Sequence, residues 1–87
     1  MLKGVTESGF AYEIDKESLD DYELLEDIRK MEKGDIGMTV DLVSRMLGEE
    51  QKERLKEHVR SADGKVSAKR LLDEFSQILA TNNETKN

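Results

Sequence analysis

A broad apolar stripe near the C-terminal end of the chain limits the folds that are open to it. Within Val66–Leu79, the apolar residues recur at i, i+1, i+4, i+7 and i+8, which places them on one face of an α-helix. These residues are Leu71, Leu72, Phe75, Ile78 and Leu79. Ser67 is a suitable N-cap, and the Asp63-Gly64 pair before it is a turn signal. We therefore expect a helix over 67–80 whose apolar face lies against the rest of the chain or against another molecule.

The chain has few apolar residues with which to cover that stripe. Its 87 residues are 36% hydrophobic and 39% charged, with no Pro, Trp or Cys. One small domain of this size is close to the lower limit of what burial alone stabilises, so a partner could contribute to its stability. The absence of cysteine excludes a disulfide framework, and no apolar run has the length of a signal peptide or a membrane span. These features predict an intracellular protein with no membrane partner.

A β-hairpin is expected at the N-terminal end, over residues 2–15. Phe10, Tyr12 and Ile14 alternate with small or charged residues, which is the period of a half-buried strand. Gly9 can adopt the positive φ that a three-residue hairpin loop with a bulge requires. Because an isolated hairpin is marginally stable in water, its apolar side chains have to rest on helices or on another strand.

Three more helices are expected between the hairpin and the last helix, over residues 18–33, 39–47 and 49–60. Ser18 with Asp21 resembles a capping box, and Thr39 is the expected cap of the second helix. Gly34 and Gly48 are the expected stops. The predicted fold is α+β and mainly helical, an N-terminal hairpin followed by about four short helices. It forms a single domain over 1–81, with 82–87 as a disordered tail.

The sequence carries no recognisable catalytic or metal-binding set. The Asp63-Gly64 turn echoes an EF-hand loop, but that register puts Val59 at the first ligand position and Arg70 at the twelfth, where a bidentate Glu is needed. His58 is the single histidine, and it is expected at the surface rather than on zinc. No nucleophile–base pair or phosphate-binding glycine loop is present. We expect a protein that is not an enzyme and that uses no metal or cofactor.

The charge distribution argues against general binding to nucleic acid. The net charge is −6, and residues 1–47 hold 12 acidic and 6 basic residues. Such a chain repels phosphate backbones. The basic residues of the 52–70 stretch leave one alternative open, a small helical regulatory or DNA-associated protein. They are Lys52, Arg54, Lys56, Arg60, Lys65, Lys69 and Arg70. A solvated surface of mixed charge explains them better, because residues 48–87 hold 8 acidic residues as well as 8 basic ones.

A partner-binding surface on this chain is expected to be apolar rather than charged. The candidate residues lie on or just beside the centres of the helical stripes, and methionines among them suit an adaptable interface. They are Met38, Leu42, Met46, Leu72, Phe75 and Leu79. The alternative, that these residues simply fill a small core, has at least equal weight.

The order of these features resembles the small tail assembly chaperones of long-tailed bacteriophages and their prophages. The resemblance covers residues 2–80 and rests on the residues that begin and end the secondary-structure elements rather than on a catalytic motif. It is carried by Gly9–Asp15, Leu19–Leu25, Leu47–Gln51 with Leu55, and Asp63–Val66 before the last helix.

The resemblance implies a non-enzymatic protein in the cytoplasm of the bacterial host. Proteins of this family bind the long, helix-rich tape measure protein and shield it during tail assembly, and they tend to self-associate. The expected partners are therefore the tape measure protein and further copies of the chain. The very polar helix expected over 49–60 departs from a simple pattern of apolar helical faces, and it leaves open which face mediates self-association.

Overall fold

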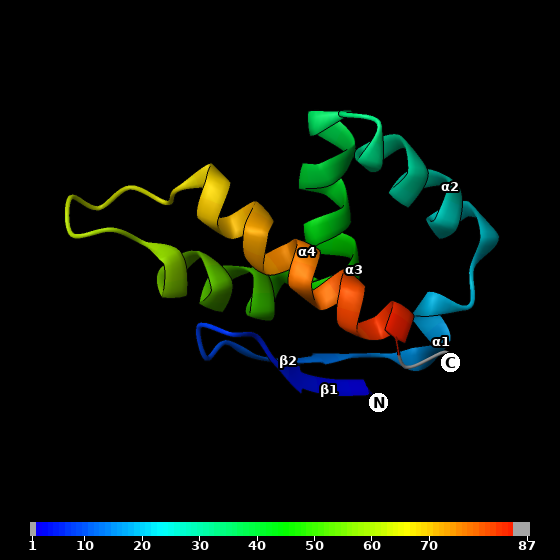
Figure 1. The fold of residues 1–87 in the computed structure, drawn as a ribbon, viewed down its shortest axis with the longest axis horizontal. Coiled ribbons are helices and arrows are strands. Elements are labelled where there is room, and N and C mark those ends of the chain that lie inside the picture. The colour runs from blue at the N-terminus through cyan, green and yellow to red at the C-terminus, as the bar shows by residue number, and fades with distance from the viewer. Residues whose placement is uncertain (1, 85–87) are drawn as a thin grey trace.

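The computed structural model describes residues 2–84, and the side chains of residues 2–80 among them. An N-terminal antiparallel hairpin is followed by four helices, which confirms the α+β, mainly helical prediction (Figure 1). The elements are β1 (Leu2–Val5), β2 (Ala11–Ile14), α1 (Lys16–Leu19), α2 (Tyr22–Glu32), α3 (Ile36–Val59) and α4 (Ala68–Glu84). Within the described part of the chain, no helix is both long and apolar enough to cross a membrane.

The hairpin has the predicted loop. Thr6 N donates to Phe10 O and Gly9 N donates to Thr6 O, each at a distance of 3.0 Å. Gly9 has a φ of 97°, which only glycine adopts readily, so the three-residue loop closes without strain. The register pairs Leu2 with Ile14 and Val5 with Ala11. Phe10, Tyr12 and Ile14 are all buried, as their alternation predicted.

The helix predicted over 18–33 is wrong in its first turn, because Asp20 and Asp21 break it. Asp15 caps the short helix α1, its carboxylate accepting from Glu17 N over 3.0 Å. Asp21 then adopts an extended conformation and caps α2, where it accepts from Glu23 N at 2.9 Å. Aspartate competes with the helix by bonding to nearby backbone N–H groups, so two in succession favour a cap over a helix interior. Ser18, which was predicted to be the N-cap, lies inside α1 and caps neither helix.

The helices predicted over 39–47 and 49–60 form one element with a kink. α3 begins three residues earlier than predicted, because Asp35 rather than Thr39 is the N-cap and accepts from Met38 N over 3.0 Å. Gly48 interrupts it with a φ of 80° and a ψ of 165°. The predicted stop at Gly48 is therefore a bend between a first half (36–47) and a second half (49–59), and the two halves run in different directions (Figure 1).

The last helix has the predicted start and a later end. Ser67 Oγ accepts from Arg70 N at 3.3 Å, and Val66 before it packs against the core. Gly64, with a φ of 90°, turns the chain after Asp63, as expected. α4 continues to Glu84, so the predicted tail over 82–87 begins too early, and residues 85–87 lie outside the described part of the chain.

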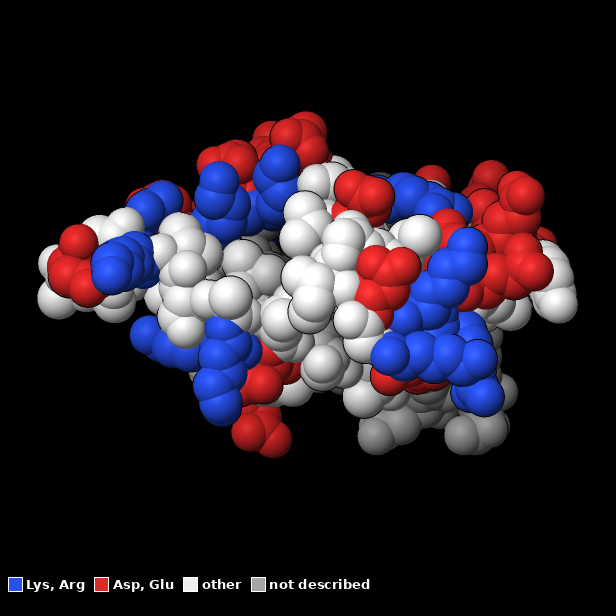
Figure 2. Space-filling view, turned by 90° about the horizontal axis from the view of Figure 1, so that it is seen from above, with Lys and Arg blue, Asp and Glu red and all other residues white. Residues whose placement is uncertain are grey.

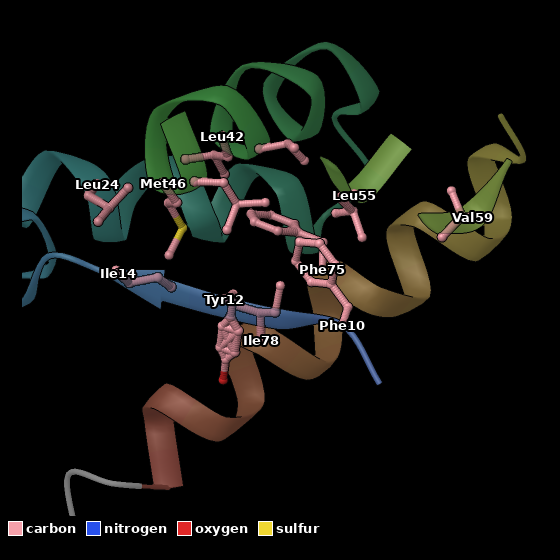
Figure 3. Packing of buried hydrophobic residues seen from close by; sticks show 12 residues of the cluster. Phe10, Tyr12, Ile14, Leu24, Leu42, Met46, Leu55, Val59, Phe75 and Ile78 are labelled. Carbon is pink, nitrogen blue, oxygen red and sulfur yellow. The ribbon is translucent and has the colours of Figure 1, made fainter. Parts of the chain in front are cut away.

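One hydrophobic core joins the hairpin to the helices. Side chains from β2, α2, both halves of α3 and α4 meet in it (Figure 3). Its largest fully buried side chains are Phe75, Ile14, Leu42, Leu55, Ile78 and Val59. The apolar stripe of α4 is thus covered mainly by the chain itself, with Phe75 only 1% exposed.

Candidate functional site: an apolar groove between α3 and α4

The bend at Gly48 creates the main apolar recess of the described structure. The φ and ψ of Gly48 lie in a region that is essentially restricted to glycine. Because the two halves of α3 diverge there, the start of α4 cannot fill the angle between them. A groove of about 380 Å³ remains in this angle.

Three segments line this groove, which we call the α3–α4 groove. The first half of α3 contributes Ile36, Thr39, Val40, Val43 and Ser44, the second half Lys52 and Lys56, and the segment entering α4 Val66, Ala68, Leu71 and Leu72. Seen from above, uncharged side chains run across the middle of the molecule with charged side chains on either side (Figure 2). The groove lining is apolar apart from Thr39, Ser44, Lys52 and Lys56, so the groove offers mainly apolar contact and two charged groups.

Ile36 and Val40 are the most unusual residues of the groove, because large apolar side chains there remain in solvent. Their exposed fractions are 66% and 63%. They lie one turn apart on the same helix and so form a continuous apolar ridge. Asp35 makes this ridge possible, since its capping bond begins α3 early enough to include Ile36.

Ion pairs fix the charged wall of the groove. Lys52 Nζ lies 2.8 Å from Glu49 Oε1, and Lys56 Nζ lies 3.2 Å from Glu53 Oε2. The hydrogen bond from Lys52 lowers the pKa of the Glu49 carboxyl, and the same bond raises the pKa of the Lys52 ammonium. Both shifts favour the charged forms, which these groups already have at neutral pH. The aliphatic stems of the two lysines contribute to the apolar lining, as such stems commonly do.

The six residues predicted to bind a partner are divided by the structure. Leu72 lines the α3–α4 groove and is half-buried. Met38 and Leu79 are half-buried and pack against the core. Leu42, Met46 and Phe75 are 0%, 7% and 1% exposed, so in this conformation they fill the core and cannot touch a partner. For these three, the alternative that the sequence left open is the correct one.

Two groove residues were missed by the sequence reasoning. The helix predicted to start at Thr39 left Ile36 outside every predicted element, and Val40 was not among the predicted partner-binding residues. A signal for both existed, because a helix that starts at Ile36 has apolar residues at 36, 40, 43 and 47 beside a second row at 42 and 46. That arc is wider than one contact with a small core can cover.

A second cluster of polar side chains joins the hairpin loop to α4. Glu74 is 6% exposed, and its Oε1 accepts from Thr6 Oγ1 at 2.6 Å and from Ser8 Oγ at 2.8 Å. Ser8 Oγ also lies 2.8 Å from His58 Nε2. A hydrolytic triad would need the carboxylate on the other ring nitrogen of the histidine. Here the Glu74 carboxylate accepts from the serine instead, so the cluster holds the hairpin loop against α4. His58 lies at the surface, as expected.

Four of the seven basic residues of the 52–70 stretch, Lys52, Lys56, Arg60 and Lys69, are paired with acids. Arg60 Nη2 lies 2.6 Å from Glu57 Oε2, and Lys69 Nζ lies 3.4 Å from Asp73 Oδ2. Arg54 donates to the carbonyl of Ala11 instead of facing solvent freely. Among the described residues, no group of three or more His, Asp or Glu side chains could hold a metal ion.

The fold and the groove together define a small helical domain with an open apolar recess. No protein-family model matches the chain, and neither the curated proteins nor the solved structures contain a significant match.

Proposed function

We propose that this protein is a tail assembly chaperone of a long-tailed bacteriophage or prophage. In this proposal it acts without catalysis in the cytoplasm of the bacterial host, where it binds and shields the tape measure protein during tail assembly and associates with further copies of itself. The ordered sequence resemblance over residues 2–80 supports the family, and the α3–α4 groove supports the mode of action.

The observation that carries the proposal is the solvent exposure of Ile36 and Val40 beside the groove. Fully burying a side chain of this kind stabilises a complex by roughly 1.5–3 kcal/mol, and about two thirds of each remains to be buried. An amphipathic helix that enters an apolar groove makes this kind of contact with residues on successive turns. A helix-rich client such as the tape measure protein presents many segments of that form.

The experiment uses Val40→Glu and measures co-purification and affinity with a tape measure fragment. Val40 is 63% exposed, so the substitution leaves the core intact while it places a charge on the apolar ridge. We expect the affinity to fall by about tenfold or more, which corresponds to roughly 1.4 kcal/mol.

The matched control is Leu25→Glu, which adds the same charge at a 47% exposed apolar position on α2, outside the groove. It should bind the fragment as the native chain does. Equal affinities for the native chain and Val40→Glu would refute the groove as the client site. If the native chain neither bound the fragment nor kept it soluble, the chaperone function itself would be refuted.

A further inference from the structure

The two edges of the hairpin differ in whether their backbone groups are satisfied. On β2, side chains of α3 act as a substitute strand. Gln51 Oε1 accepts from Glu13 N and Gln51 Nε2 donates to Glu13 O, each at 2.7 Å. Arg54 Nη2 donates to Ala11 O at 3.3 Å. Both outward-facing residues of β2 are therefore engaged by the protein's own helix, and this edge is closed to another strand.

The edge of β1 has no such cover. Thr6 N bonds inward to Phe10 O, and alternation along an antiparallel strand then turns the N–H and C=O groups of Lys3 and Val5 outward. No hydrogen bond to these outward groups is found within the described residues. β1 also lies at the margin of the molecule, with no other described element beyond it (Figure 1). Unpaired edges of this kind are templates for another strand.

We propose that β1 is a self-association edge, where a second copy of this chain pairs its own β1 in antiparallel orientation about a two-fold axis at Gly4. This deepens the self-association part of the proposed function and names its surface. The outward residues Lys3 and Val5 are equidistant from Gly4. In this register Lys3 of one copy faces Val5 of the other, so every outward N–H and C=O group of both residues gains a partner.

The side chains around the axis are compatible with a copy of the same strand. β1 carries no acidic residue, and the charge of Lys3 is already paired with Glu13 of its own hairpin at 3.5 Å. Val5 is 67% exposed on the outer face and would be covered by Lys3 and Val5 of the second copy. At the axis, Gly4 has no side chain, so the two copies bring no pair of side chains into conflict there.

Cysteine cross-linking tests the register, because the native chain contains no cysteine. In the proposed register, the Cα atoms of residue 3 and of residue 5 in the other copy lie about 5.5 Å apart, within the range of a disulfide. Identical residues of the two copies are diagonal neighbours at about 7–8 Å or more. A mixture of Lys3→Cys and Val5→Cys chains should therefore give predominantly the mixed disulfide dimer under mild oxidation.

The control mixture is Ala11→Cys with Glu13→Cys, which places the same pair on the closed edge of the same hairpin. It should remain uncross-linked under the same conditions. Equal yields from the two mixtures, or like-with-like dimers as abundant as the mixed one, would overturn the proposal.

Val5→Pro tests the edge without any cross-link. The substitution fixes φ and removes an N–H that points away from β2, so no bond within the hairpin is lost. It should convert a sample with twice the mass of the chain in light scattering into one with the mass of a single chain. Ala11→Pro, directly across the ladder, should leave the mass unchanged, and circular dichroism checks that both variants keep the hairpin. If Val5→Pro still forms the native dimer, the β1 edge is wrong while self-association stands. If the native chain stays monomeric at all concentrations, the β1 edge and self-association are both wrong. Client binding is tested separately, by Val40→Glu.

Discussion

Substitution of Gly48 by alanine is expected to destabilise the protein through the backbone alone. A Cβ at this position would meet no atom within 4 Å, so the change creates no steric overlap with neighbours. The cost comes from the φ of 80° and ψ of 165°, which alanine adopts only with strain of about 1–3 kcal/mol. The reduced entropy of the unfolded chain returns about 0.4–1 kcal/mol, and mid-range values of the two terms leave a net loss of roughly 1–2 kcal/mol.

That loss is large for a domain of this size. An 87-residue chain has a free energy of unfolding of about 4–13 kcal/mol. A net loss of 1–2 kcal/mol lowers the melting temperature by about 4–16 °C, since each kcal/mol shifts it by about 4–8 °C. Urea and thermal unfolding followed by circular dichroism measure both quantities.

Gly37→Ala is the matched control on the same helix. Gly37 lies in the first turn of α3, it has no positive φ, and its nearest new contact would be an ordinary 3.6 Å from Asp35 Oδ1. Alanine there should stabilise the protein by up to about 1 kcal/mol through helix propensity. The reasoning fails if Gly48→Ala unfolds at the same temperature as the native chain, or if the two substitutions shift the melting temperature in the same direction.

Three further changes test the packing and the electrostatics. Gly4→Ala would place its Cβ 2.6 Å from Tyr12 Cζ, so we expect a loss of about 1–3 kcal/mol in urea unfolding, and an unchanged midpoint would mean that the ring moves freely. Phe75→Ala should cost about 3–5 kcal/mol, because Phe75 is 1% exposed at the centre of the core, and a cooperative melt at the native temperature would contradict that position. The Arg45 guanidinium, 2.6 Å from Asp27, lowers the pKa of that carboxyl, so its stabilising contribution is complete above the unfolded pKa of about 3.9 and is lost as the pH falls through the lower folded value. Asp27→Asn should therefore lower the urea midpoint at about pH 7 and have little effect at about pH 2, and an equal effect at both would exclude this ion pair as the cause.

Local signals in the sequence were sufficient for the hairpin and for the last helix. Gly9 fixed the loop type, the alternation around Tyr12 identified the buried face, and Ser67 marked the start of α4. Each of these depends on residues that are neighbours in the chain, where backbone preference and short-range hydrogen bonds decide the outcome. The same rules misplaced the start of α2, because Ser18 and Asp21 are both residue types that favour an N-cap. The break at Asp20-Asp21 makes Asp21 the cap.

The wide apolar arc of a helix that starts at Ile36 indicated an uncovered face, but the shape of the groove could not be predicted because it depends on how far each helical face is covered. Leu42 and Val40 have similar hydrophobicity and lie two residues apart, yet Leu42 is 0% exposed and Val40 is 63% exposed. Residues two apart point to nearly opposite faces of a helix, and only the face that carries Leu42 is covered by the core. Identifying Gly48 as a helix stop gave no information on the direction of the helix that follows.

The bond between Thr6 and Glu74 also has a consequence for the order in which the domain can form. It links residues 68 positions apart, and the neighbouring core places Phe75 and Ile78 against a hairpin made long before them. During translation the hairpin and α3 therefore lack the part of their apolar cover that Phe75 and Ile78 supply until α4 has left the ribosome. The newly made chain should be open to chaperones and proteases until that moment, and it should become resistant to proteolysis in a single late step.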